Sequence, residues 1–288
     1  MNKLIIAAAL AGAGTSKEAN PSVPYHADEI AEQVVACAKA GAAAVHIHVR
    51  EDSGWPTMDT DKFTAAFEAI KKATEAAGVD VVVNLTTSGA SGIVPNELRL
   101  AHLKKLRPEM CSFDAGTMNW NNGGVFVNAP DFLEQLSATV VAEDIKPEIE
   151  IFDNGMIGNS LYYINKYHIP TPCHFQFVLG VGGGADGTVR NLNFLREMLP
   201  EGSTWSVTGI GKTHLPMLLT ALAMGADGVR VGLEDNLYLS RGVKATNVQL
   251  VERAAAIAKL CGREIATAEE ARAIWGIKRH ALAEYTPA

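Results

Sequence analysis

Eight short apolar segments recur along this chain at the spacing of strands that alternate with helices, and this repeat restricts the fold more than any other feature. The segments lie near residues 3–9, 43–49, 80–87, 109–114, 147–152, 172–179, 204–209 and 227–232. Helix-like patterns lie between them, for example over residues 26–40 and 212–224, and a further one covers 243–260. Alternating strands and helices give a parallel sheet, and eight strands favour its closure into a barrel.

The length of the chain agrees with this interpretation. Its 288 residues are the usual size of one such barrel, and no linker, low-complexity tract or fixed-period repeat divides them. Gly41, Gly78 and Gly225 stand where three of the helices would stop before a strand. We therefore predict an α/β fold, namely a single (β/α)8 TIM barrel domain over residues 1–288 with a C-terminal helical extension.

The first apolar segment has two interpretations. A basic residue followed by an apolar stretch at residues 3–12 resembles a short signal peptide. A buried first strand is also a continuous apolar run, and the strand count reaches eight only if this segment is kept. We favour the strand and expect a cytoplasmic protein. No apolar run approaches the roughly 18 residues of a membrane span, so we expect no membrane partner.

The net charge bears on the class of partner, and the spacing of the cysteines bears on the redox compartment. The formal net charge of −7 argues against a nucleic-acid partner, because proteins of that class present a basic face. The cysteines are scattered, without a C-x-x-C pair, at Cys37, Cys111, Cys173 and Cys261. This spacing favours buried thiols in a reducing compartment over a disulfide framework or a zinc knuckle.

One face of most predicted strands is polar, whereas an ordinary barrel interior is packed with branched apolar residues. The polar residues, spaced two apart, are Asn84, Thr86 and Ser88; Ser112 and Asp114; Glu148 and Glu150; His174 and Gln176; Ser206 and Thr208; and Arg230, Gly232 and Glu234. Because helices cover the outside of such a barrel, the polar faces must line its lumen. Buried charges are costly unless they are paired or bind a metal, so the pattern predicts a bound ion or a charge network.

The histidine pair of the second predicted strand is the strongest candidate for that ion. His46 and His48 lie two apart and therefore share a face. Barrel closure brings Glu234, at the end of the eighth strand, toward them, and two histidines with one carboxylate suit Zn(II) or Fe(II) as a Lewis acid. Asp235 beside Arg230 fits a general base, and a structural salt bridge is the alternative.

Two loops at the same end of the predicted barrel are candidate binding elements. The turn over residues 86–92 precedes a helix that starts near Pro95, and its hydroxyl and N–H groups could hold a substrate carboxylate. The glycine-rich loop 180–187 fits neither the P-loop nor the dinucleotide frame. It could let a long cofactor pass the backbone at Gly182 and Gly183, or it could be a mobile lid.

Several long motifs, taken in order, resemble the β-keto acid cleavage enzymes over nearly the whole chain. The matching segments are HIHVRED at residues 46–52, TTSG at 86–89, DAGT at 114–117, PEIE at 147–150, FQFVLGV at 175–181 and GVRVGLEDN at 228–236. The resemblance implies a zinc-dependent barrel in which a β-keto acid and acetyl-CoA give acetoacetate and a new acyl-CoA. It also implies a homo-oligomer, such as a tetramer.

The resemblance also assigns site residues. The metal ligands of the family match His46, His48 and Glu234, and the pair that removes a proton from the keto acid matches Arg230 and Asp235. Substrate contacts match Thr86 and Ser112, although the better-known pattern has these two residue types exchanged, and Gly89 lies in the same turn as Thr86.

One departure from the family pattern affects specificity. Members that act on an amino-bearing keto acid carry a glutamate in the loop after the first strand, and alignment places Gly14 there. The absent carboxylate favours a neutral acyl chain, or a quaternary ammonium group if Trp120 faces the pocket.

Two other function classes stay open at this point. Barrel hydrolases of the amidohydrolase type also use H-x-H, with a metal that activates water. They carry that motif on the first strand and need further histidine and aspartate ligands, whereas His174 is the one later strand histidine here. A non-catalytic metal-binding or ligand-binding barrel is the third class. Turnover of a β-keto acid with and without acetyl-CoA distinguishes the three.

Overall fold

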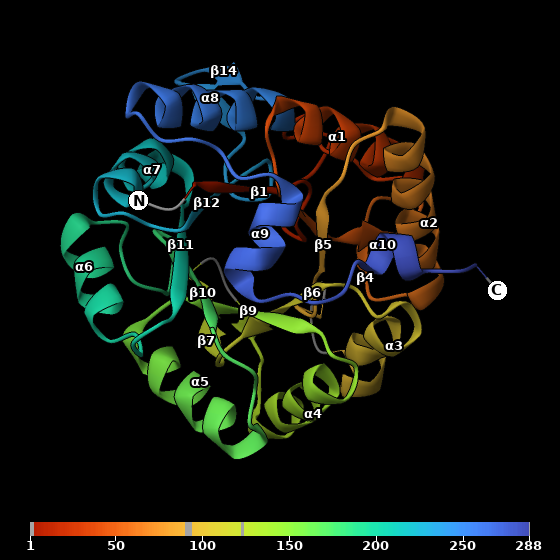
Figure 1. Cartoon of the computed structure of the whole chain (residues 1–288), viewed down its shortest axis with the longest axis horizontal. Helices are drawn as coiled ribbons and strands as arrows, with labels where there is room; N and C mark the ends of the chain where they lie inside the picture. Colours follow the sequence, from red (N-terminus) through yellow and green to blue (C-terminus); the bar gives the residue numbers. More distant parts are fainter. Residues whose placement is uncertain (1–2, 90–93, 122–123, 288) are drawn as a thin grey trace.

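The eight predicted strands form one closed parallel barrel in the computed structural model, which describes residues 3–89, 94–121 and 124–287 (Figure 1). Around the barrel the strands follow the order β1-β12-β11-β10-β9-β6-β5-β2. Their bounds are β1 (Ile5–Ala9), β2 (Ala44–Ile47), β5 (Val82–Leu85), β6 (Met110–Asp114), β9 (Lys146–Ile151), β10 (His174–Leu179), β11 (Thr204–Gly209) and β12 (Gly228–Val231). The barrel prediction is confirmed, and the first apolar segment is strand β1, which pairs with both β2 and β12.

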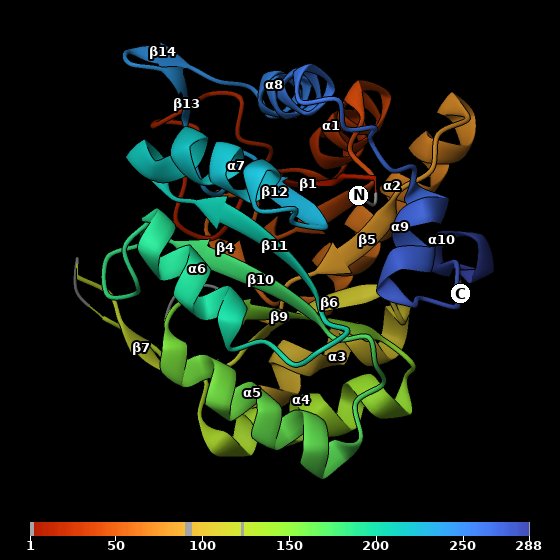
Figure 2. The same ribbon diagram turned by 60° about the vertical axis from the view of Figure 1, so that its left-hand side comes forward.

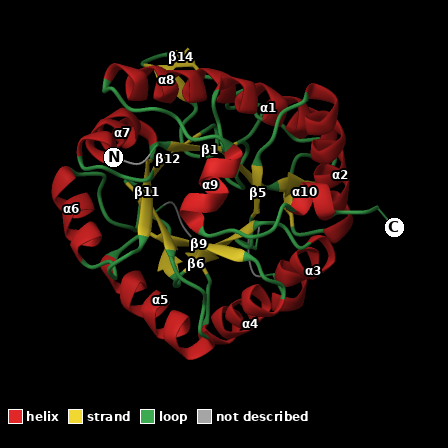
Figure 3. Ribbon diagram, viewed as in Figure 1, coloured by secondary structure: helices red, strands yellow, loops and turns green. Residues whose placement is uncertain are grey.

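A ring of helices covers the outside of the barrel (Figure 3). The ring consists of α1 (Ala27–Ala40), α2 (Thr60–Ala77), α3 (Asn96–Leu106), α4 (Pro130–Ala142), α5 (Asn154–Tyr167), α6 (Val189–Glu197), α7 (His214–Ala223) and α8 (Asn247–Leu260). Asp59 and Asp153 cap the first turns of α2 and α5 by accepting hydrogen bonds from backbone N–H groups. Among the described residues no helix is both long and apolar enough to cross a membrane.

The last predicted helix begins four residues later than its pattern indicated. Residues 243 and 244 form strand β14 (Val243–Lys244), which pairs with β13 (Tyr238–Ser240) in a hairpin. Thr246 then caps α8, because its side chain accepts a hydrogen bond from the N–H group of Gln249. The prediction of a helix from residue 243 was therefore wrong at its start, since apolar residues of a short hairpin extend the helical pattern.

Short β-hairpins lie at one end of the barrel. Besides β13–β14 they are β3 (Val49–Arg50) with β4 (Pro56–Thr57) and β7 (Met118–Asn119) with β8 (Val125–Phe126). Figure 2 shows β7, β13 and β14 on one side of the molecule and both chain termini on the other. The hairpins follow the C-terminal ends of barrel strands, the end where active sites of this fold lie.

Helix α9 (Ala268–Trp275) lies across the opposite mouth of the barrel (Figure 1). Trp275 is 1% exposed and packs with apolar residues from the starts of the strands, such as Ile5 and Met110. Its ring also lies 4.9 Å from that of His174, between centroids. Arg272 donates a 2.5 Å hydrogen bond to buried Glu109. Helix α10 (Ala281–Glu284) then packs against α2. Helix α9 thus covers the mouth of the barrel opposite the hairpins.

Replacing Trp275 with alanine should destabilise the fold without altering the lumen at the hairpin end. A buried tryptophan replaced by alanine leaves a cavity, so the free energy of unfolding should fall by about 3–5 kcal/mol in urea titrations. Trp55→Ala is the matched control, because Trp55 is 69% exposed and its loss should change stability by about 0.5 kcal/mol or less. Equal losses in the two variants would contradict the role of α9.

The prediction of buried thiols holds for three of the four cysteines. Cys37, Cys111 and Cys173 are buried, and burial raises the pKa of the Cys37 thiol to about 12. Cys261 is exposed, so the prediction was wrong there. The reason is its position directly after the last turn of α8, where the chain leaves the apolar face of that helix.

Candidate metal centre and its surroundings

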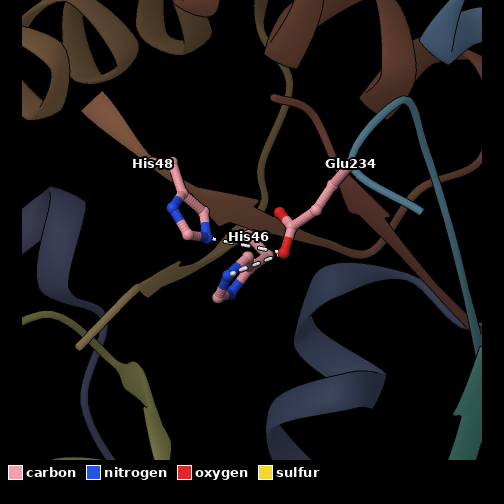
Figure 4. A group of neighbouring side chains, drawn as sticks. All are labelled: His46, His48 and Glu234. Atoms are coloured by element: carbon pink, nitrogen blue, oxygen red, sulfur yellow. Dashed lines mark ion pairs between the residues drawn. The ribbon is translucent and has the colours of Figure 1, made fainter. Parts of the chain in front are cut away.

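Three potential metal ligands converge at the hairpin end of the lumen (Figure 4). His46 lies in β2, His48 follows that strand, and Glu234 lies in the turn after β12. The Glu234 Oε1 atom is 3.8 Å from His46 Nε2 and 3.4 Å from His48 Nε2. In Figure 4 both imidazole rings and the carboxylate point toward one another. The three potential ligand atoms lie within 4.8 Å of one another.

The chemistry of these donors fits a divalent metal ion. Burial lowers the pKa of His46 to about 3, so its imidazole is neutral and keeps a free lone pair. Burial alone would raise the pKa of Glu234, but Arg230 and the two histidines hold it well below its usual range. His46 Nδ1 and Glu234 Oε2 are buried without a hydrogen-bond partner among the described residues. The neutral His46 imidazole and the ionised Glu234 carboxylate, with the His48 imidazole beside them, are the donor types of a zinc site.

The loop after β1 brings Glu234 into place. Gly12 has a φ of +61°, and a Cβ atom there would lie 2.5 Å from Glu234 Cγ, so only glycine permits this approach. Buried Arg50 donates hydrogen bonds to the carbonyls of Gly12 at 2.6 Å and Thr15 at 2.8 Å. Gly14 lies in this loop and is exposed, and no neighbouring atom lies within 4 Å of the place that a Cβ atom would take there. A larger side chain therefore has room at Gly14.

One guanidinium holds both the candidate base and a candidate ligand. Arg230 Nε donates to Asp235 Oδ2 at 2.9 Å, and Arg230 Nη2 donates to Asp235 Oδ1 at 3.1 Å and to Glu234 Oε1 at 2.5 Å. The Thr208 hydroxyl also donates to Asp235 Oδ2, at 3.0 Å. Burial raises the pKa of Asp235, while Arg230 opposes this shift. The arrangement is a salt bridge in geometry and still leaves a carboxylate beside the three ligands.

Two further lumen carboxylates join this network. Glu150 Oε1 accepts a 3.4 Å hydrogen bond from Arg230 Nη1, and Glu148 Oε2 accepts one of 2.6 Å from Asn84 Nδ2. Burial raises the pKa of Glu148 to about 7 and that of Glu150 well above its usual range. Both carboxylates also lie near His46. The polar-face pattern had found these residues, but it gave no reason to group them with Arg230.

The predicted substrate turn lies next to the metal ligands in the barrel order, because β5 neighbours β2. Ser112 and Thr86 are buried, and the Ser112 hydroxyl accepts a 2.9 Å hydrogen bond from the N–H group of Thr87. The Thr86 hydroxyl accepts one of 3.1 Å from the N–H group of Ser88. Gly89 is buried against the guanidinium of Arg99. Residues 90–92 of this turn lie outside the described residues.

The glycine-rich loop after β10 packs against the β7–β8 hairpin. The N–H group of Asn121 donates to the Gly182 carbonyl at 3.3 Å, and a Cβ atom at Gly183 would lie 1.8 Å from the Asn119 carbonyl oxygen. Close packing therefore accounts for glycine at position 183. In the same hairpin the Trp120 ring stacks on that of Phe126, 5.5 Å away between centroids.

His174 lies at the start of β10, and its Nε2 atom is 3.9 Å from Glu148 Oε1. Its Nδ1 atom is 2.9 Å from the Thr204 hydroxyl, and its Nε2 atom is 3.1 Å from that of Ser206. No group of potential ligands in the described part of the chain includes it. The further histidine ligand that a hydrolase of the amidohydrolase type needs is therefore not supplied by this residue.

The chain is similar to known proteins over nearly its whole length. Residues 3–277 match the family model of the beta-keto acid cleavage enzyme. A 3-keto-5-aminohexanoate cleavage enzyme of Fusobacterium nucleatum is 43% identical over 280 residues, covering 97% of this chain and 100% of the relative. A 3-dehydrocarnitine:acetyl-CoA trimethylamine transferase of Rhizobium meliloti is 33% identical, covering 94% and 96%. The solved structure of ObcA with oxaloacetate superposes with a TM-score of 0.80 at 24% identity, covering 89% of this chain and 68% of ObcA, and supports the fold.

Proposed function

Since this chain belongs to the β-keto acid cleavage enzyme family, we propose that it converts a β-keto acid and acetyl-CoA into acetoacetate and a new acyl-CoA. The observation that carries this proposal is the hold of Arg230 on both Asp235 and Glu234, which keeps a base beside the metal ligands. The name of the Rhizobium meliloti relative includes acetyl-CoA, which supports acetyl-CoA as the second substrate.

Different residues of the lumen would bind the metal ion and the substrate carboxylate. His46, His48 and Glu234 would hold a divalent ion, which we propose to be Zn²⁺ and which supplies a Lewis acid toward the oxygens of the keto acid. The hydroxyls of Thr86 and Ser112 and the backbone at Gly89 would bind the substrate carboxylate. These groups orient the keto acid so that its C2 atom faces Asp235.

Asp235 starts the reaction by taking a proton from C2 of the keto acid. The C2 carbanion attacks the carbonyl carbon of acetyl-CoA, the carbon–sulfur bond breaks, and CoA leaves as its thiolate. The thiolate then attacks the C3 carbonyl of the condensed intermediate, and the bond between C2 and C3 breaks. The acetoacetate carbanion recovers its proton from Asp235, so the cycle consumes no proton and leaves the acyl group on CoA.

Incubation with a panel of β-keto acids tests the reaction class. Consumption of the keto acid should require acetyl-CoA and should yield equal amounts of acetoacetate and acyl-CoA. Turnover without acetyl-CoA would identify a hydrolase, and binding without turnover would leave the non-catalytic alternative. His174 belongs to no group of potential metal ligands among the described residues, which argues against the hydrolase.

Gly14 should make a primary-amine keto acid a poor substrate, although a relative is named for such a substrate. A cation that leaves water needs a partner, and Gly14 offers no carboxylate. We expect kcat/KM to be higher for a neutral or a quaternary-ammonium keto acid. Trp120 is half-buried against Phe126, and a cation–π contact from it stays a prediction. Preference for the primary amine by more than about tenfold, or roughly 1.4 kcal/mol, would contradict this role.

A reverse substitution at the same position gives the sharper comparison. Gly14 has open space around it, so Gly14→Glu fits and should raise kcat/KM for the primary-amine substrate by about tenfold. Gly14→Gln is the matched control, because it adds the same bulk without the charge. A gain of equal size in both variants would show that bulk, and not charge, determines the preference.

Three other expectations stay predictions. The glycine loop at Gly182 and Gly183 would lie along the path of the CoA arm, although packing against Asn119 already explains its composition. A homo-oligomer such as a tetramer, and a cytoplasmic location, rest on the family resemblance and on residue composition.

A further inference from the structure

A cavity of about 570 Å³ opens at the hairpin end of the barrel, next to the candidate base. Its walls come from the turn after β11, which includes Lys212, and from the segment 236–242 after β12. The first of these turns contacts the candidate base residue directly, since the N–H group of Gly211 donates a 3.2 Å hydrogen bond to the Asp235 carbonyl. These are the seventh and eighth barrel strands, whose loops often form a phosphate site in this fold.

The lining of this cavity combines cationic and apolar side chains. Lys212, Arg241 and Arg253 supply three positive charges in a chain whose formal net charge is −7. No carboxylate occurs among the described residues that line it, and none of the three cations forms an ion pair in the described structure. Leu215 and Tyr238 contribute the apolar wall. The cavity therefore favours an anion that carries an apolar or aromatic group.

Two side chains of the lining, those of half-buried Arg253 and buried His214, have buried hydrogen-bonding atoms without a partner among the described residues. Arg253 donates through Nη1 to the Leu239 carbonyl, but its Nε and Nη2 atoms are buried and have no partner in the described chain. His214 is 3% exposed, and neither ring nitrogen has a partner at hydrogen-bond geometry, although the Gly209 backbone lies beside the ring. Buried donors left unpaired are costly, and a guanidinium prefers a phosphate or carboxylate as its partner.

The glycine-rich loop connects this cavity with the path proposed for the thioester. A Cβ atom at Gly180 or Gly187 would lie 2.6 Å or 2.5 Å from the Thr213 side chain, so the loop packs directly on the turn that carries Lys212. A long acyl carrier that leaves the candidate metal centre along this loop would reach the cationic residues Lys212, Arg241 and Arg253. Coenzyme A has the required chemistry, because its reactive thiol and its phosphorylated adenosine lie at opposite ends of one flexible arm.

We propose that this cavity binds the nucleotide end of coenzyme A, with its phosphates on Lys212, Arg241 and Arg253 and its adenine against Leu215 and Tyr238. This inference rests on the proposed function for the identity of the ligand. The inference extends the proposed function, because it names the residues that would distinguish acetyl-CoA from a shorter thioester. The chemistry at the metal centre needs none of these residues.

The double variant Lys212→Gln/Arg241→Gln tests the subsite. Both residues are exposed, so the fold should persist. The KM for acetyl-CoA should rise by about tenfold or more, because charge-assisted contacts to phosphate are lost, while kcat and the KM for the keto acid stay unchanged. S-acetylpantetheine lacks the nucleotide and should react equally with both proteins. Lys39→Gln/Arg196→Gln is the matched control, with exposed residues at the ends of α1 and α6.

Direct binding separates failure of the subsite from failure of the proposed reaction. In calorimetry the native protein should bind adenosine 3′,5′-bisphosphate, and Arg253→Met and the double variant should bind it at least about tenfold more weakly. Such binding without turnover would contradict the reaction and leave the subsite standing. An unchanged KM for acetyl-CoA in the double variant would overturn the subsite. The subsite would also be overturned if the native protein bound inorganic phosphate as tightly as adenosine 3′,5′-bisphosphate. A change of oligomeric mass as the sole effect of the double variant would overturn it as well.

Discussion

Alanine in place of His46 should remove both the bound metal and the activity while leaving the fold intact. His46 supplies one of three converging ligand atoms, and the carboxylates of Glu148 and Glu150 also lie beside it, so its loss removes a polar contact and not an apolar one. A metal that acts as a Lewis acid contributes several kcal/mol to transition-state stabilisation, so the rate should fall by about 10³-fold or more. The native protein should retain about one zinc ion per chain after dialysis, measured by plasma mass spectrometry.

A surface histidine provides the control for this substitution. His168→Asn changes an exposed histidine after α5, where asparagine tolerates the positive φ, and it should leave metal content and rate unchanged. Circular dichroism and thermal melting should give native curves for both variants. A native protein that is metal-free and fully active in the presence of a chelator would contradict the assignment of the metal ligands.

The fold could be predicted from sequence because its signal is repeated. Each barrel strand is a short apolar run beside a helical pattern, and an error at one run does not change the total arrangement. The boundaries were less accurate: β5 spans Val82–Leu85, whereas the pattern covers residues 80–87. Apolar and polar alternation continues past the last ladder hydrogen bond, so side-chain patterns do not report where pairing ends.

The convergence of the candidate metal ligands was predictable, because neighbouring strands determine it. His46 and His48 share a face by spacing, and the pairing of β1 with both β2 and β12 brings Glu234 to them. Contacts across the lumen were not predictable in the same way. Glu150 on β9 meets Arg230 on β12, three strands away around the barrel, and only the length of the two side chains bridges that gap. No local pattern records such a distance.

Close packing explains the remaining difference between sequence and structure. A glycine-rich loop is typical both of ligand contact and of tight backbone packing, and the residues alone do not separate the two. The Asn119 carbonyl, which excludes any side chain at Gly183, belongs to a hairpin more than sixty positions earlier in the chain. This contact exists only in the folded protein, because the hairpin follows β6 and the loop follows β10.

Asparagine at position 235 should abolish proton removal while keeping the bound metal and the bound substrate. The amide preserves the shape of the side chain but cannot accept the C2 proton, and loss of a general base costs about 10²–10⁴ in rate. The ligand Glu234 stays paired with Arg230, so the metal content should not change. In deuterium oxide, exchange at C2 of the keto acid should fall to the uncatalysed background, as followed by nuclear magnetic resonance.

A second aspartate makes this test specific to the site. Asp80 pairs with Arg272 through two oxygens, at 2.5 Å and 2.9 Å, near the closed mouth of the barrel. Asp80→Asn therefore removes one charge from a similar arginine pair far from the metal ligands, and its C2 exchange should match that of the native protein. If the variant Asp235→Asn exchanged deuterium at the native rate, another group would have to accept the C2 proton. Glu150, which also touches Arg230, would then be the nearest candidate, and the base would have to be reassigned.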